Sequence, residues 1–193
     1  MIDILLPIYN GEKYIVEQIQ SLEKQTISNF RIIIRDDGSK DNSSILIEKI
    51  AAIDKRILIV KDNKGNLGIS KCIEELIKYV TSDYFMFCDQ DDKWIPTKIE
   101  RTLVKMREIE SLYLYSPVLV CTDSICVNDK EEIISQSFFE LQKFCDIAGN
   151  EVKMAALNIV QGNTCMLNKY CKKYIKFIPN ELVYDQWIAI IIA

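Results

Sequence analysis

The chain has 193 residues, of which 49% are hydrophobic and 27% charged, a composition typical of a folded protein with one substantial core and unlike a disordered or fibrous chain. Its net charge of −4 argues against a nucleic-acid-binding surface, because phosphate binding depends on concentrated lysine and arginine. Seven scattered cysteines contain no Cys-x-x-Cys pair, which favours free thiols in a reducing cytosol over a zinc site or a disulfide framework.

Apolar periodicity predicts alternating strands and helices. Nearly continuous apolar runs indicate strands at 2–8, 30–35, 56–61 and 84–88, and helical spacing indicates helices at 12–25, from about 42, and at 68–80. The inner faces of the last two helices are expected to be Leu46, Ile50 and Ile53, and Ile69, Ile73, Leu76, Ile77 and Val80. This pattern predicts a Rossmann-like α/β fold, in which a mainly parallel sheet is covered by helices on both faces.

Polar clusters follow each predicted strand. The segments "PIYN", "RDDGSKD", "KDNKGNLG" and "CDQDD" come directly after the four strands. Open α/β sheets bind ligands beyond the carboxyl ends of their strands, so four clusters at one edge favour a shared site. Each cluster also has a simpler interpretation, such as a plain turn over residues 7–11, or an Asx turn in "DDGSKD" with a helix N-cap at Asp41 or Asn42.

The segment "YFMFCDQDDKW" places Asp89, Asp91 and Asp92 directly after an apolar run. Like charges repel one another, and apolar neighbours remove the water that would screen them. We therefore expect a positive group at this site, with a solvated acidic turn as the alternative.

Several enzyme classes lack their signatures. Neither G-x-G-x-x-G nor G-x-x-x-x-G-K-[ST] occurs, which argues against a dinucleotide oxidoreductase and a P-loop enzyme. "DQDDKW" is not an EF-hand loop, because Trp94 stands where the sharp turn needs glycine. The absence of histidine from the sequence excludes Ser-His and Cys-His nucleophilic systems and leaves Asp, Glu, Lys, Tyr or Cys as the general base.

In this order and spacing, "LLPIYNGEKYIVEQIQSLEKQT", "IIIRDDGSKD", "NLG" and "FCDQDDKW" resemble the large family 2 of nucleotide-sugar glycosyltransferases, which has the GT-A fold. The later "YDQWIA" resembles the acidic motif on the acceptor side of that family. The resemblance implies a single catalytic domain over 1–193, with a nucleotide-binding part at about 1–95 and an acceptor part at about 96–193. Because "YDQWIAIIIA" stops in an apolar run without a polar cap, we expect this domain to be truncated at its C-terminus.

The resemblance assigns the residues after the first two strands to the nucleotide. Tyr9, beside Pro7, matches the residue whose ring stacks on a pyrimidine base, with a core tyrosine as the alternative. Asp37, preceded by Asp36, matches the acid that accepts a hydrogen bond from the ring N–H of uracil or thymine. This implies a UDP- or dTDP-sugar donor, because cytosine has no such N–H.

The resemblance also accounts for the three carboxylates. Asp89 and Asp91 match the D-x-D frame of the family, and Asp91 and Asp92 match the pair that meets the ribose and the metal. The implied cofactor is Mn²⁺ or Mg²⁺, because a hard ion is commonly held by one or two carboxylates together with substrate phosphates. The ion would be the positive group expected from the charge pattern.

The remaining site residues belong to the acceptor half. Asp185 matches the family's catalytic base, with a helix-start aspartate as the alternative. Gly162 and Asn163 match a segment on the acceptor side, with a tight turn before a strand as the alternative. Asp123 is a candidate contact to the donor sugar or a turn cap.

The implied activity is metal-dependent, inverting transfer of a sugar to a saccharide or lipid-linked acceptor in bacterial surface-polysaccharide synthesis, and "FCDQDD" with "YDQW" looks rhamnosyltransferase-like. One alternative is a nucleotidyltransferase, which needs a basic phosphate loop near the first strand. Another is a non-catalytic sugar-nucleotide-binding domain, in which Asp185 is dispensable.

The same sequence predicts a cytoplasmic protein. "MIDILLPIYN" carries an acid at position 3 and too short an apolar segment for a signal peptide. Residues 96–110 predict an amphipathic helix, whose basic side chains either face solvent or contact anionic lipid at the inner face of the membrane.

Overall fold

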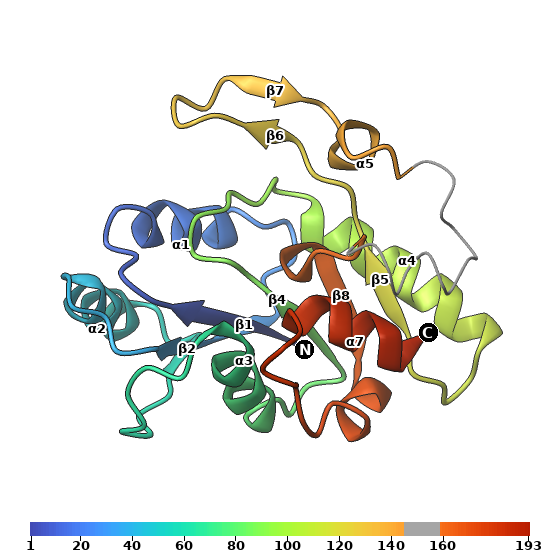
Figure 1. Cartoon of the computed structure of the whole chain (residues 1–193), viewed down its shortest axis with the longest axis horizontal. Helices are drawn as coiled ribbons and strands as arrows, with labels where there is room; N and C mark the ends of the chain where they lie inside the picture. The colour runs from blue at the N-terminus through green and yellow to red at the C-terminus, as the bar shows by residue number, and fades with distance from the viewer. Residues whose placement is uncertain (145–158) are drawn as a thin grey trace.

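A computed structural model describes residues 1–144 and 159–193, and its centre is one mixed sheet (Figure 1). The strand order is β3-β2-β1-β4-β8-β5. Four strands run parallel, namely β1 (Ile2–Ile8), β2 (Phe30–Asp36), β3 (Ile57–Ile59) and β4 (Tyr84–Phe87). β8 (Cys165–Asn168) lies antiparallel between β4 and β5 (Leu119–Cys121). The expected Rossmann-like α/β architecture is confirmed, and strands from both halves of the chain share one sheet.

Helices cover both faces of this sheet. One core packs the sheet against α1 (Ile15–Glu23), α2 (Ser43–Ile53) and α4 (Lys98–Leu112). The other core packs it against α3 (Ile69–Lys78), the short helix η2 (Lys169–Lys173) and α7 (Tyr184–Ile192). Alternate residues of β1 serve the two sides, since Ile4 and Leu6 belong to the first core and Leu5 to the second. Burial on both sides explains why the strands read as continuous apolar runs.

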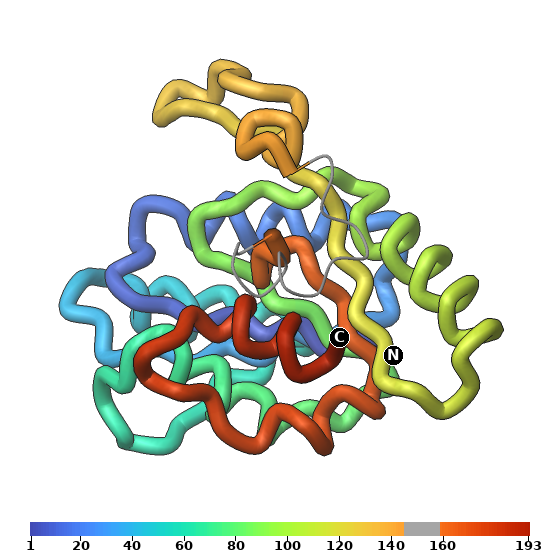
Figure 2. Tube along the Cα trace, turned by 45° about the vertical axis from the view of Figure 1, so that its right-hand side comes forward, coloured from blue at the N-terminus to red at the C-terminus, as the bar shows by residue number. Residues whose placement is uncertain are grey.

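A second, smaller sheet lies apart from the main one. It is a hairpin of β6 (Cys126–Val127) and β7 (Ile133–Ser135), followed by α5 (Phe138–Leu141). Both views show this arm projecting from the body of the molecule (Figures 1 and 2). Within residues 1–144 and 159–193, no helix is long and apolar enough to span a bilayer.

The structure contradicts the inner-face position expected for two residues, Ile53 and Ile69. Ile53 is 85% exposed, whereas Ile47, which the pattern did not single out, is 2% exposed and belongs to the core. At 3.6 residues per turn Ile53 lies about 120° around the helix from Ile47, and Leu46 and Ile50 lie between them on the same side, so Ile53 is the farthest of the three from the buried centre at Ser43 and Ile47. Ile69 is 48% exposed because it opens the first turn of α3 at the carboxyl edge of the sheet, where it lines a pocket.

Candidate active site

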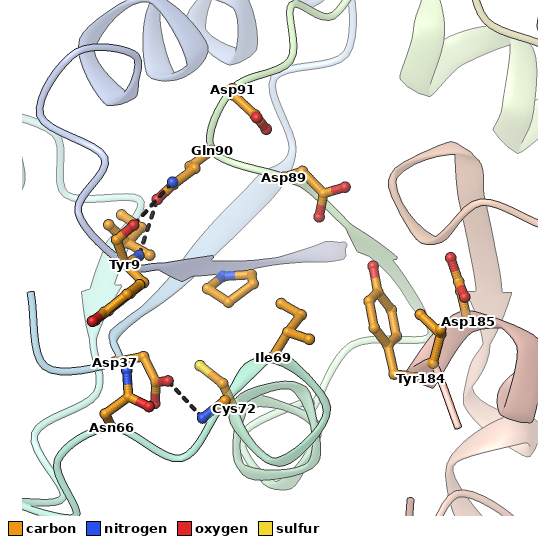
Figure 3. Close-up of a pocket in the computed structure, with 14 residues that line it drawn as sticks. Tyr9, Asp37, Asn66, Ile69, Cys72, Asp89, Gln90, Asp91, Tyr184 and Asp185 are labelled. Atoms are coloured by element: carbon orange, nitrogen blue, oxygen red, sulfur yellow. Dashed lines mark hydrogen bonds between the residues drawn. The ribbon is translucent and has the colours of Figure 1, made fainter. Parts of the chain in front are cut away.

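The carboxyl ends of β1, β2 and β4 surround a pocket of ≈ 520 Å³, within the size range of small-molecule sites. Figure 3 shows Tyr9, Asp37 and Asn66 along one side, Asp89 and Asp91 along a second, and Tyr184 and Asp185 facing them. Pro7, Gly68, Ile69, Cys72, Gln90 and Val183 complete much of its lining. Residues from all four polar clusters therefore line one pocket at this edge of the sheet.

Asp37 organises the side of the pocket that lies at the end of β2. Its Oδ1 accepts hydrogen bonds from the Leu67 N–H (2.9 Å) and from the Arg35 guanidinium, and its Oδ2 accepts one from the Gly68 N–H (2.8 Å). A carboxylate offers about four acceptor positions, so Oδ2 keeps capacity for a further donor. Asp37 thus presents a fixed acceptor to the pocket.

Arg35, which our sequence analysis missed, holds this arrangement in place. Its side chain is 1% exposed and forms a second ion pair with Asp62, at 2.9 Å between Nε and Oδ2. Burial alone would lower its pKa, but hydrogen bonds to Asp62, Cys72 and Asp37 raise the pKa well above its ordinary value, so the charge is retained. The available signal was a charged residue in an otherwise apolar strand, a position that requires charged partners.

Tyr9 lines the pocket, whereas Asp36 does not. Tyr9 is 45% exposed and lines the pocket, so it is not a core tyrosine. Asp36 instead accepts hydrogen bonds from the Ser39 N–H (2.9 Å) and hydroxyl (2.6 Å), the Asx-type turn considered above, and it is not a lining residue. Asn42 precedes α2 without a side-chain capping bond. Asp41 accepts a hydrogen bond from the Ser43 N–H (3.0 Å).

The three acids after β4 face two directions. Asp89 and Asp91 line the pocket, whereas Asp92 accepts a hydrogen bond from the Asn163 amide and lies near the Lys98 ammonium. Burial raises the pKa of Asp89 to about 7, with further contributions from the charges of Asp92, Asp91 and Asp185. Burial likewise raises the pKa of Asp92. This is the unfavourable concentration of negative charge that the sequence pattern predicts.

These acids could supply some of the ligands of a divalent ion, but not a complete set. Among the residues that the structure describes, no three Asp, Glu or Cys side chains are already arranged to hold a metal. The raised pKa values nevertheless show carboxylates whose charge a cation would stabilise. One or two carboxylates are a usual protein contribution when substrate phosphates supply the remaining ligands. The chemistry of the cluster therefore suits Mg²⁺ or Mn²⁺ bound together with a phosphorylated substrate.

A short turn connects the acceptor-side residues. In η1 (Gly162–Thr164), the Gly162 N–H donates to Asp185 Oδ2 (3.0 Å), and the neighbouring Asn163 binds Asp92. Asp185 lies in the first turn of α7, where its Oδ1 also accepts from the Gln186 N–H (2.7 Å). The helix-start position and the pocket-facing position of Asp185 thus occur together. Asp123 is not brought to the pocket, since it accepts hydrogen bonds from the Ser124 (2.8 Å) and Phe139 (3.1 Å) N–H groups.

Tyr184 is a further pocket residue that sequence reasoning missed. Its ring packs edge-on against Phe87, at 5.3 Å between centroids, and is buried beside Asp185. A Cβ on Gly162 would lie 1.8 Å from the Tyr184 hydroxyl, so glycine is required there by close approach. No periodicity in the sequence indicates this contact, because the two residues are 22 positions apart.

Comparison with known proteins identifies the family. The chain matches Glycosyl transferase family 2 over residues 3–172. It is 30% identical over 154 residues to the UDP-Glc:alpha-D-GlcNAc-diphosphoundecaprenol beta-1,3-glucosyltransferase WfaP of Escherichia coli, covering 79% of this chain and 59% of that protein. It is 26% identical to WfgD of the same species, a glucosyltransferase of the same description, covering 99% of this chain and 70% of that protein.

Solved structures show the same fold. The S. aureus TarS 1-349 structure in complex with UDP-GlcNAc superimposes with a TM-score of 0.70 at 20% identity, covering 99% of this chain and 52% of that one. The mannosyltransferase PcManGT of Pyrobaculum calidifontis, in complex with GDP-Man and Mn²⁺, gives 0.67 at 14% identity, covering 97% and 50%. The chain thus spans about half the length of these structures. From its sequence match and its GT-A architecture, the chain belongs to glycosyl transferase family 2.

Proposed function

We propose that this protein is an inverting glycosyltransferase that moves a sugar from a UDP- or dTDP-sugar to a saccharide or lipid-linked acceptor. The observation that carries the proposal is one pocket that gathers Tyr9, Asp37, Asp89, Asp91 and Asp185 at the carboxyl edge of the sheet. WfaP and WfgD, which are named for UDP-Glc and a diphosphoundecaprenol acceptor, support this choice of substrates. Surface-polysaccharide synthesis at the cytoplasmic face of the membrane, and a deoxysugar donor of the rhamnose type, belong to the same proposal.

In this mechanism the side of the pocket formed by Tyr9 and Asp37 selects the nucleobase of the donor. The exposed ring of Tyr9 stacks on the pyrimidine, and the remaining acceptor position of Asp37 Oδ2 takes the ring N–H of uracil or thymine. Leu67, Gly68 and Arg35 hold the Asp37 carboxylate, so this acceptor is already oriented before the donor binds.

Asp91, with Asp92 or Asp89 as its partner, would hold the divalent ion against the donor diphosphate. When bound, the ion supplies stabilisation of the negative charge that grows on the leaving nucleoside diphosphate. Asp91 lines the pocket directly, whereas Asp92 accepts a hydrogen bond from the Asn163 amide beside it.

Asp185 is the proposed general base. Its carboxylate removes the proton from the acceptor hydroxyl as that oxygen attacks the anomeric carbon, and the bond from that carbon to the nucleoside diphosphate breaks on the opposite side, which inverts the configuration. The Gly162 and Gln186 N–H groups fix the orientation of the carboxylate during this step.

Calorimetric titration with UDP, dTDP, GDP and CDP, each with and without Mn²⁺, tests the proposal. We expect metal-dependent binding of UDP or dTDP and weak binding of CDP, because cytosine lacks the N–H that Asp37 would accept. Binding of none of the four would overturn the proposed donor class. Equal affinity with and without Mn²⁺ would overturn the metal assignment alone.

A further inference from the structure

The side chain of Gln90 joins the loop after β1 to the loop after β4. Its Nε2 donates to the Tyr9 carbonyl oxygen (3.1 Å), and its Oε1 accepts from the Tyr9 N–H (3.0 Å). Figure 3 shows both hydrogen bonds at the edge of the pocket, between the side that carries Tyr9 and the side that carries Asp89 and Asp91. One side-chain amide therefore pairs with both main-chain groups of a single residue.

This pairing continues the sheet where the backbone ladder stops. The register of β1 with β4 ends at Leu5 and Phe87, followed by one hydrogen bond from the Cys88 N–H to the Leu5 carbonyl (2.9 Å). β1 runs on to Ile8 paired with β2 on its other side. At Tyr9 the Gln90 side chain thus supplies the one acceptor and the one donor that a neighbouring strand would supply from two separate peptide groups.

Gly11 allows this approach. A Cβ at Gly11 would lie 2.4 Å from Gln90 Oε1 and 2.9 Å from Gln90 Cδ, too close for the amide to stay in place. Gly11 is not among the described glycines with positive φ, so the requirement for glycine comes from close contacts, chiefly with Gln90 and more weakly with Ile8 Cγ2 at 3.3 Å, and not from backbone conformation. Gly11 and Gln90 are therefore a matched pair, 79 residues apart in the sequence.

The other side of the same loop is tied to the β2–α2 connection. The Asn10 N–H donates to the Ser39 hydroxyl oxygen (2.9 Å), and the Gly11 N–H donates to the Ser43 hydroxyl oxygen (2.7 Å). Gln90 supplies the corresponding attachment toward β4. Because Gln90 stands between Asp89 and Asp91, its two hydrogen bonds hold the backbone of Tyr9 at a set position relative to both carboxylates.

We infer that Gln90 is a positioning residue for donor binding: it fixes the Tyr9 loop against the Asp89–Asp91 loop, so that the stacking ring and the carboxylates meet the nucleoside diphosphate already in register. This rests on the proposed function of the pocket. A loop that is ordered before binding does not lose conformational entropy when the ligand arrives, so the clamp increases affinity for the nucleotide. The clamp should affect the rate of the transfer step less than the affinity, because Asp185 belongs to α7 and not to either of the two loops that Gln90 joins.

The test compares Gln90→Ala, Gly11→Ala and the double variant with the unchanged 193-residue chain. Gln20→Ala, at an exposed position of α1, is the matched control. The measurements are the UDP dissociation constant with Mn²⁺, KM and kcat for transfer, and Tm. We expect Gln90→Ala to raise the dissociation constant and KM by about tenfold, as expected for the loss of one or two neutral hydrogen bonds, with kcat changed less than KM.

Gly11→Ala should have the same effect without touching Gln90 itself, because the added Cβ displaces the amide. In the Gln90→Ala background the two closest atoms are gone and only Ile8 Cγ2 remains near the Cβ, at 3.3 Å, so the double variant should lie close to Gln90→Ala alone. Additive losses in the double variant would overturn the clamp. So would wild-type UDP affinity in both single variants, or a fall in affinity explained by a matching fall in Tm. Failure of the unchanged chain to bind UDP or dTDP would instead overturn the proposed function, and the clamp with it.

Discussion

At the residue scale, the pocket depends on charged groups that the fold has buried. Arg35 is 1% exposed and bridges Asp37 and Asp62, so the acid proposed to read the base is held by a guanidinium within the protein. The pattern "RDDG" marks the position of these acids at a strand end, but it does not show that the preceding arginine turns back to bind one of them. That contact depends on which way the strand residue faces.

The clearest prediction at this scale concerns the proposed base. Asp185→Asn should lower kcat by about 10²–10⁴-fold, the usual contribution of general-base catalysis, while the UDP dissociation constant stays close to that of the unchanged chain. Steady-state transfer kinetics combined with calorimetry separate the two effects. Asp83→Asn is the control, because Asp83 is an exposed acid that pairs with Lys169. Turnover retained in Asp185→Asn would place the base elsewhere.

At the scale of elements, the turn η1 links the two acidic centres of the site. Its consecutive residues Gly162 and Asn163 contact Asp185 and Asp92, so a change in this turn should affect both. A tight turn before a strand is the alternative interpretation of this segment, and the structure has η1 followed directly by β8. The partners of Gly162 and Asn163 lie 23 and 71 positions away in the chain, a separation that no local sequence pattern indicates.

Gly162→Ala tests this linkage. The new Cβ would overlap Tyr184, whose ring is held by Phe87, so we expect the free energy of unfolding to fall by about 1–3 kcal/mol and transfer to be largely lost. UDP binding should change less, because the proposed contacts to the nucleobase lie at the ends of β1 and β2 and at the start of α3. Chemical denaturation and calorimetry measure the two quantities. In a Tyr184→Ala background the added cost of Gly162→Ala should disappear, and an undiminished cost there would contradict the steric explanation.

The packing of α2 gives a second prediction at this scale. Ile47→Ala should lower the free energy of unfolding by about 2–5 kcal/mol, since it removes a fully packed side chain from the core. Ile53→Ala should change it by less than about 0.5 kcal/mol, because Ile53 is exposed to solvent. Urea denaturation of the two variants provides a matched comparison within one helix. Equal losses would show that α2 packs in a different rotation.

At the scale of the whole molecule, Asp3 ties the amino ends of β1 and β2 to the segment that leads into β4, on the edge opposite the pocket. It is buried and accepts hydrogen bonds from Arg31 (3.0 Å) and from the N–H groups of Thr81 (2.9 Å) and Ser82 (3.1 Å). Burial would raise its pKa, but the hydrogen bonds from Arg31, Thr81 and Ser82 outweigh burial and lower the pKa below its ordinary value of 3.8. The acid at position 3 is thus structural.

This shift predicts how stability responds to acid. A carboxylate whose pKa is lower in the folded chain contributes stability that is complete above the unfolded value near 3.8 and is lost as pH falls through the lower folded value. We expect Asp3→Asn to cost about 2 kcal/mol at pH 7 and to show a shallower loss of stability below pH ~4 than the unchanged chain. Urea midpoints measured between pH 7 and pH 3 compare the two. Parallel curves would show that Asp3 does not contribute to acid unfolding.

Much of the fold was predictable because its causes are local. Apolar runs without polar interruption indicate strands buried on both faces, and four such strands separated by helices leave a parallel sheet as the economical arrangement. The site was predictable as a location, since polar clusters after successive parallel strands must meet at one edge. The family motifs then supplied the expected roles of Tyr9, Asp37, Asp91 and Asp185, which stay predictions until the variants are measured.

By itself, the sequence determined the fold class, the edge of the sheet that carries the pocket, and the family, because spacing and residue type suffice for each. Only the tertiary structure decided that Asp36 closes a turn, that Asp92 contacts Asn163, that Asp123 lies outside the pocket, and that Gln90 binds Tyr9. These facts depend on side-chain direction and on contacts between residues far apart in the chain. Such contacts arise when the packed sheet brings loops together, and one-dimensional spacing does not record them.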